Sequence, residues 1–254
     1  SLDAKELLKA AATLASSDRL EGHQILLKTL SSSVFLTNLN SPEQYAGDRK
    51  RLKVRRILDI LVRNKSLFAT QTLLGLTRSP VFLQEISRIE LLILATAEIR
   101  PMPPELVAFW DKYSHPEEAT TSVVITAIFI NLTEAALNLF EVKMRNLIHD
   151  ADEKVYWLRY DVLSHRDSPI VVATCGRLLK SGLDGRLRSE LVDVLFDYKP
   201  AIWYTPAVNF NSPEVENYPP DTRSQLLNIA NYVLTNMQLS DEQKDAIEKT
   251  KSKL

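Results

Sequence analysis

Glycine and cysteine are scarce in this chain, which has 6 glycines, 1 cysteine and 12 prolines among 254 residues. Glycine makes up about 2% of the residues, against about 7% in average proteins. Tight β-hairpin turns depend on glycine and on Asn-Gly pairs, and the sequence has no such pair. The glycine-rich motifs that hold phosphates are also absent. The composition therefore disfavours an all-β fold and excludes the known phosphate-binding loops.

The charges are balanced, with a net charge of −1 and a sequence pI of about 6.4. A nucleic-acid partner is therefore not expected, because no strong basic field covers the whole chain. The strongest apolar run, residues 123–130, is far shorter than the roughly 18 residues of a membrane span. We expect no membrane span and slightly favour a cytoplasmic location. Because the sequence begins with Ser, removal of a signal peptide stays open.

Apolar residues recur at helical spacing, for example at Leu7, Leu8, Ala11, Leu14 and Ala15. Polar or proline breaks separate such segments near residues 79, 101, 115, 131, 151, 167, 184 and 200. Two successive intervals together span about 35 residues, the length of a two-helix repeat. The sequence therefore predicts an all-α fold, a right-handed α-α superhelix in which antiparallel helix pairs stack as a solenoid.

Residues 146–159 contain a short Asp turn that leads into a helix with acidic residues, then Val and a basic residue. This segment resembles the corner of a HEAT repeat, and residues 76–83, 112–118 and 163–171 resemble degenerate copies. The resemblance covers about residues 48–198 and implies a HEAT-like solenoid. We expect one helical-repeat domain over residues 1–254. Its parts are N-terminal helices and a loop with one short helix (1–47), repeats (48–198), an irregular aromatic and proline-rich loop (199–221) and C-terminal capping helices (222–254).

A basic run at residues 49–56 supplies the first candidate binding surface. If Val54 points inward, Arg49, Lys53 and Arg56 share the opposite helical face, which could bind phosphates or an acidic partner. The alternative is a solvated face that keeps the array soluble, and we favour this alternative because charge runs usually have that role.

The loop at residues 199–221 supplies the second candidate. Trp203, Tyr204, Phe210 and Tyr218 lie among prolines on chain that we expect to be irregular. Large aromatic side chains are enriched among binding hot spots. The alternative, slightly favoured, is that the loop caps the end of the array with its aromatic side chains buried.

No catalytic residue, metal site or cofactor is expected. His149 with Asp150 and Asp152 is the best metal-binding candidate, but aspartates at a helix start are explained by capping. Cys175 lies inside a helical pattern and is expected to be a small core residue. The chain is therefore expected not to be an enzyme, although this question stays open.

The favoured function is a non-enzymatic protein-binding or scaffolding module that docks a protein or peptide on its concave face. One alternative is a nucleic-acid-binding protein similar to the HEAT-like alkylpurine DNA glycosylases. Another is a small-ligand protein similar to the HEAT-like bilin lyases, in which Trp157, Tyr160 and Asp161 would serve the groove. The sequence specifies neither the partner nor the oligomeric state.

Overall fold

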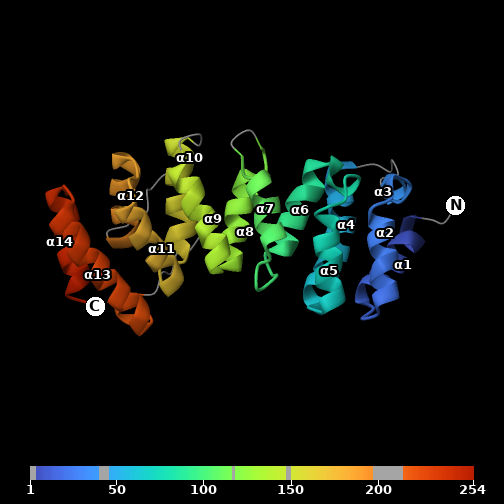
Figure 1. The fold of residues 1–254 in the computed structure, drawn as a ribbon, viewed down its shortest axis with the longest axis horizontal. Helices are drawn as coiled ribbons and strands as arrows, with labels where there is room; N and C mark the ends of the chain where they lie inside the picture. Colours follow the sequence, from blue (N-terminus) through green and yellow to red (C-terminus); the bar gives the residue numbers. More distant parts are fainter. Residues whose placement is uncertain (1–3, 40–45, 116–117, 147–149, 197–213) are drawn as a thin grey trace. The chain divides into compact units, whose positions relative to one another are not determined.

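The computed structural model describes residues 4–39, 46–115, 118–146, 150–196 and 214–254, and for residues 4, 38–39 and 46–52 it describes the backbone alone. Over these ranges the protein is all-helical, with 14 α-helices and no strand (Figure 1). The prediction of an all-α fold is therefore confirmed. None of the described helices is long and apolar enough to cross a membrane.

The helices fall into two compact units, residues 1–133 and 134–254. In the first unit the helices are α1 (Ala4–Ser16), α2 (Leu20–Leu30), α3 (Ser33–Leu39), α4 (Ala46–Asn64), α5 (Leu67–Leu76), the 3-10 helix η1 (Phe82–Gln84), α6 (Ile86–Thr96), α7 (Pro104–Lys112) and α8 (Thr121–Asn131). In the second they are α9 (Glu134–Arg145), α10 (Ala151–Trp157), the π-helix η2 (Leu158–Val162), α11 (Pro169–Lys180), α12 (Gly185–Phe196), the 3-10 helix η3 (Val215–Asn217), α13 (Pro220–Asn236) and α14 (Asp241–Lys251).

Within each unit the helices pack in two rows. In the first unit α1, α4, α6 and α8 contact one another in that order. α2 and α5 contact each other and form a second row, in which α2 packs on α1 and α5 packs on α4. In the second unit α9, α11 and α13 form one row, and α10, α12 and α14 form the other. Helices of one row pack on the next helix of that row, and the pairs α1–α2, α4–α5, α11–α12 and α13–α14 also pack against each other. This arrangement is typical of a repeat-like helical array.

Most helix boundaries lie at the breaks that the sequence predicts. Asp150 caps α10 by accepting a hydrogen bond from the Asp152 backbone N–H at 3.0 Å, so the capping interpretation of Asp150 is confirmed. The side chain of Asp152 pairs with Arg186 instead. Proline begins α7, α11 and α13, where its missing N–H costs no helical hydrogen bond. Ser240 and Gln243 form a capping box at α14.

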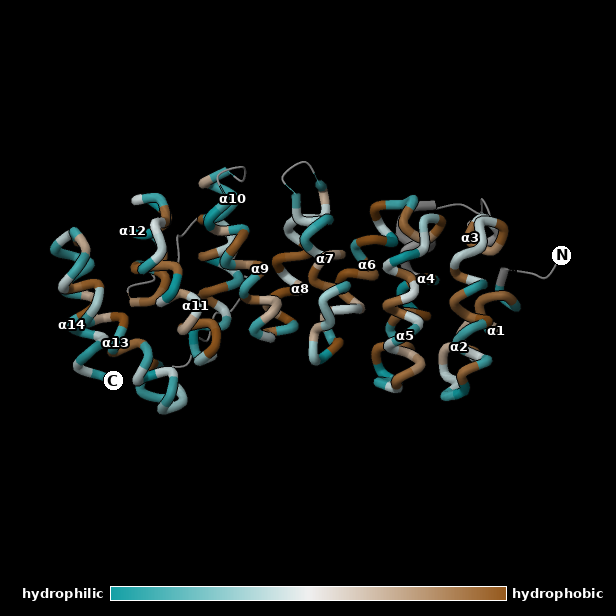
Figure 2. Tube along the Cα trace, in the orientation of Figure 1, coloured by the Kyte–Doolittle hydropathy of each residue, from teal (hydrophilic) through white to brown (hydrophobic). Residues whose placement is uncertain are grey.

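The core consists of the apolar stripes of these short helices. Figure 2 shows hydrophobic segments alternating with hydrophilic ones along the helices, as expected for helices that bury only one side. The largest fully buried side chains include Trp110 and Phe129 in the first unit and Trp157 and Phe140 in the second.

Cys175 is buried as expected, and burial raises the pKa of its thiol to about 12. It is therefore no reactive nucleophile at neutral pH.

In the first unit, a polar network joins the end of α8 to the chain that follows α6. The buried Asn131 amide donates to the carbonyls of Ala97 and Ile99, at 2.9 and 3.0 Å. Arg100 Nε donates at 2.8 Å to the Asn131 carbonyl, which the end of the helix leaves without a helical donor. Asn131 therefore fixes one helix end against another segment of the same unit.

Replacement of Asn131 by Ala should lower the free energy of unfolding of the first unit. The substitution leaves the Ala97 and Ile99 carbonyls without their amide donor in a buried site, which costs roughly 2–3 kcal/mol. Urea unfolding followed by circular dichroism measures the change. The matched control is Gln71→Ala on the exposed face of α5, which should change stability by less than about 0.5 kcal/mol. Equal stability of the two variants would contradict this role of Asn131.

Candidate functional site: a cation-lined groove between α1 and α4

The structure describes some of the binding residues that the sequence predicts, and others lie outside the described residues. Trp203, Tyr204 and Phe210 lie outside the described residues, and so does the side chain of Arg49. Of the basic run, Lys53 is half-buried and Arg56 is exposed on α4, while Val54 points inward, as the interpretation of this run required, with 6% of its surface exposed. Of the three candidate cations, Lys53 and Arg56 are therefore those whose side chains the structure describes, and Arg56 lines a groove whose lining residues do not include Lys53.

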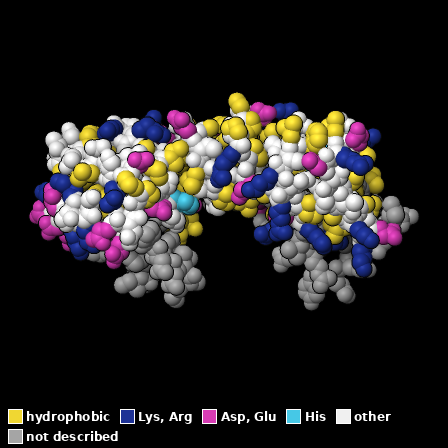
Figure 3. All heavy atoms as spheres, turned by 90° about the horizontal axis from the view of Figure 1, so that it is seen from below, with side chains coloured by type: hydrophobic (Ala, Val, Ile, Leu, Met, Phe, Trp, Pro, Cys, Tyr) yellow, Lys and Arg dark blue, Asp and Glu magenta, His cyan; other side chains and the backbone are white. Residues whose placement is uncertain are grey.

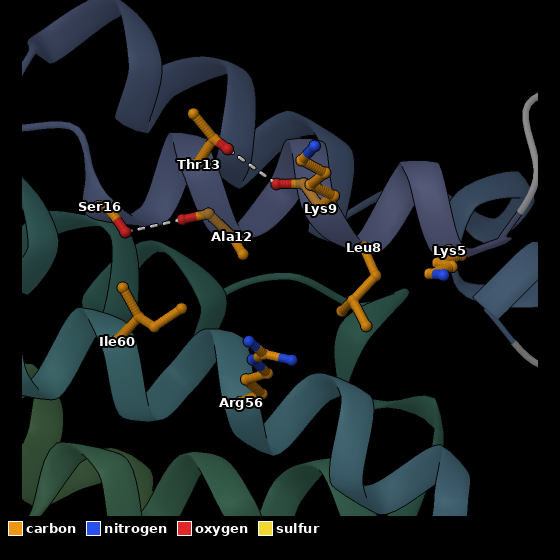
Figure 4. Close-up of a pocket in the computed structure, with 8 residues that line it drawn as sticks. All are labelled: Lys5, Leu8, Lys9, Ala12, Thr13, Ser16, Arg56 and Ile60. Atoms are coloured by element: carbon orange, nitrogen blue, oxygen red, sulfur yellow. Dashed lines mark hydrogen bonds between the residues drawn. The ribbon is translucent and has the colours of Figure 1, made fainter.

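Arg56 lies in a groove between α1 and α4, the two helices that begin the first row. The groove has a volume of about 540 Å³. Figure 4 shows Arg56 and Ile60 extending from α4, and Leu8 from α1, toward the space between the two helices. Its lining residues are Lys5, Leu8, Lys9, Ala12, Thr13 and Ser16 from α1, with Arg56 and Ile60 from α4. We call this site the α1–α4 groove.

The groove combines an apolar floor with a cationic rim. Leu8, Ala12 and Ile60 are half-buried, whereas the five polar lining residues are exposed. Three of these five carry a positive charge, and no acidic residue is among the described residues that line the groove. Figure 3 shows that Lys and Arg side chains are numerous on the visible face of the first unit, at the right of the view.

The hydroxyl groups of the groove already use their protons. Thr13 donates to the Lys9 carbonyl at 2.9 Å, and Ser16 donates to the Ala12 carbonyl at 2.9 Å (Figure 4). Each hydroxyl has a single proton, so its oxygen can only accept further hydrogen bonds. The charged donors of the groove, such as Lys9 and Arg56, suit carboxylate or phosphate oxygens.

Sequence reasoning missed Lys5 and Lys9, which line the same groove as Arg56. They lie about 50 residues earlier in the chain, and no local pattern indicates that α1 packs beside α4. A usable signal exists within α1 itself, because Lys5 and Lys9 are four residues apart and so share one face of the helix.

A second groove in the first unit has mixed charge. Its volume is about 310 Å³, and Lys65, Glu98 and Arg100 are among its lining residues. Arg100 is already bound to the carbonyls of Ile130 and Asn131 at the end of α8. The charged side chains of this groove are therefore of both signs, whereas those of the α1–α4 groove are all positive.

The three residues of the small-ligand alternative have different environments. Trp157 is buried, with 1% of its surface exposed, so it belongs to the core of the second unit. Tyr160 packs against Tyr156, with 4.2 Å between the ring centroids. Asp161 lies in the π-helix η2, and burial raises the pKa of its carboxyl to about 7. A π-helical turn is uncommon and is often found at functional sites.

Tyr218 is the described member of the aromatic candidate set, and 3% of its surface is exposed. Burial raises the pKa of its phenol. Such burial is what the capping interpretation expects of this side chain.

His165, which the sequence places at a helix corner, lies near η2, with its Nδ1 atom 2.8 Å from the Asp161 carbonyl. Among the described residues, no group of three or more His, Cys, Asp and Glu side chains could hold a metal ion, and His149 lies outside them.

Replacement of Asp161 by Asn should stabilise the second unit above neutral pH. The raised pKa means that between about pH 4 and pH 7 the folded chain binds more protons than the unfolded chain, so stability falls as the pH rises through this window. Asn stays neutral, so the variant should gain roughly 2 kcal/mol over the original protein at pH 8 and almost nothing at pH 4. Denaturant unfolding at both pH values measures this. The exposed Asp245→Asn serves as control, and an equal pH dependence in both variants would refute the assignment.

Comparison of the chain with protein-family models, with curated proteins and with solved structures gives no match. No family is therefore identified for it. A proposal about its function has to rest on its helical architecture and on the α1–α4 groove.

Proposed function

We propose that this chain is a non-enzymatic protein-binding module, built as a right-handed, HEAT-like solenoid, and that the α1–α4 groove receives a segment of a partner protein. The observation that carries the proposal is the groove itself, in which exposed cations border a half-buried apolar floor. Protein interfaces combine such an apolar centre with a polar rim.

The packing of the helices supports a binding role. Helical-repeat proteins present surfaces made by successive helices of one row, and partners dock along these surfaces. In the first unit α1 and α4 are successive members of such a row. The groove between them is therefore in a position where a repeat protein receives a partner.

The composition of the groove favours a protein segment over a small molecule. Pockets for small ligands enclose most of the ligand and orient it with a few rigidly placed polar groups. Here five of the eight lining residues are exposed, and the cations are long and flexible side chains. A surface of this kind suits a ligand that extends along the helices and makes many contacts.

The same composition disfavours the nucleic-acid alternative. Proteins that bind single strands stack bases on aromatic side chains, and no aromatic residue is among the described residues that line the groove. Proteins that bind duplexes need many phosphate contacts, whereas this chain has a net charge of −1. The apolar floor made by Leu8, Ala12 and Ile60 would gain nothing from a phosphate backbone.

Site-specific photocrosslinking tests the proposal. A benzophenone amino acid replaces Thr13 at the groove, or replaces Thr126 on α8, which is also exposed and also donates to the carbonyl four residues earlier. In an extract of the source cells, the groove probe should form discrete protein adducts that the Thr126 probe does not form. Addition of Arg56→Glu to the Thr13 probe should weaken these adducts.

The result that would contradict the proposal is the same weak background from both probes while both variants remain folded. Circular dichroism provides the check on folding. Adducts that survive Arg56→Glu unchanged would place the partner elsewhere on the first unit and would remove the groove from the binding function.

A further inference from the structure

The charge of the α1–α4 groove indicates what kind of segment it can hold. Lys5 and Lys9 on α1 and Arg56 on α4 line one continuous space. In the described part of the chain, neither Lys9 nor Arg56 has an ion-pair partner. The nearby Asp59 is bound to Arg55 instead, at 3.9 Å, and does not line the groove. A ligand that brings carboxylates would supply the missing countercharge.

The hydrogen-bonding capacity of the groove points the same way. The Thr13 and Ser16 protons are used within α1, so the side-chain donors that a ligand meets are ammonium and guanidinium groups. Hydrogen bonds from such groups to carboxylates are stronger than neutral ones. A segment rich in Lys or Arg would meet no carboxylate among the described lining residues, and the cations of the groove would repel it.

The apolar floor adds a requirement for spacing. Leu8 and Ala12 are four residues apart on α1, and Arg56 and Ile60 are four residues apart on α4. Ridges of side chains at this spacing on one helix pack into the grooves of another. The lining of α1 runs from Lys5 to Ser16, which is about 16 Å at 1.5 Å per residue. A helix of about three turns would cover this length.

From these features we infer that the occupant of the α1–α4 groove is an acidic amphipathic helix of a partner protein. This inference rests on the proposed function. The apolar stripe of the helix packs on Leu8, Ala12 and Ile60, and its flanking Glu or Asp side chains pair with Lys9 and Arg56. The mode of recognition is a helix in a groove, with apolar anchors about one turn apart.

A peptide panel tests the inference on the full chain. The first probe is a fluorescent amphipathic peptide of about 14 residues, or roughly four turns, with a Leu stripe and Glu elsewhere. The second carries Lys in place of Glu, and the third carries Ser in place of Leu. A single-stranded oligonucleotide is the fourth probe, which tests whether a negatively charged ligand binds without forming an amphipathic helix. Fluorescence anisotropy at low ionic strength measures binding, because salt screens exposed charges.

The acidic Leu peptide should bind most tightly. Arg56→Glu should weaken its binding about fivefold, and Lys9→Glu combined with Arg56→Glu should weaken it further. The matched control is Lys28→Glu, the same charge change at an exposed position of α2 that does not line the groove, and it should have little effect. Each of these residues is exposed, so the variants should keep the fold, which circular dichroism checks.

Three results would overturn the inference and leave the proposed function standing. The first is that the Lys peptide binds as tightly as the acidic Leu peptide or more tightly, and the second is that the Ser peptide binds as tightly as the Leu peptide. The third is that Lys28→Glu weakens binding as much as Arg56→Glu does. In each case the Thr13 photocrosslinks persist. If the oligonucleotide binds and competes with the acidic peptide, the ligand of the groove is a nucleic acid and not a helix of a partner protein. If no peptide binds and Thr13 forms no specific adduct, both the inference and the proposed function fail.

Discussion

The structure depends on one constraint, which is that none of its helices can bury its apolar stripe alone. Most of them have between 7 and 13 residues, and isolated helices of this length are marginal in water. Each helix gains stability only when its stripe packs on a neighbour. The two-row packing within each unit satisfies this requirement, since helices of a row contact the next helix of that row and several also contact their neighbour in sequence.

The same constraint produces the candidate binding groove. Where α1 and α4 lie side by side in one row, Ala11 and Ala15 of α1 and Ile57 and Leu61 of α4 are buried. Residues at the outer edge of the contact, such as Leu8, are covered only in part. A shallow apolar floor is therefore a consequence of packing two helices. What distinguishes this groove is that the side chains along its rim share one charge sign.

Polar side chains then fix the ends of the helices. Asn131 and Arg100 satisfy carbonyl groups at the junction between α6 and α8, and Asp150 and Ser240 satisfy N–H groups at helix starts. In the second unit, the buried Glu141 of α9 accepts hydrogen bonds from Arg145 of its own helix and from Arg177 of α11. These interactions are local or join adjacent helices, so each of the units is held together mainly by contacts between near neighbours.

The sequence by itself determined the helical class and most of the helix boundaries, because capping residues, prolines and apolar periodicity act within a few residues of where they occur. The inward position of Val54 and the cap at Asp150 followed from such local rules. The tertiary structure alone decided that Lys5 and Lys9 join Arg56 in one groove, and that Trp157 and Tyr218 are buried. These facts depend on which helices pack together across long stretches of chain, and the spacing of residues along one helix carries no information about its neighbours.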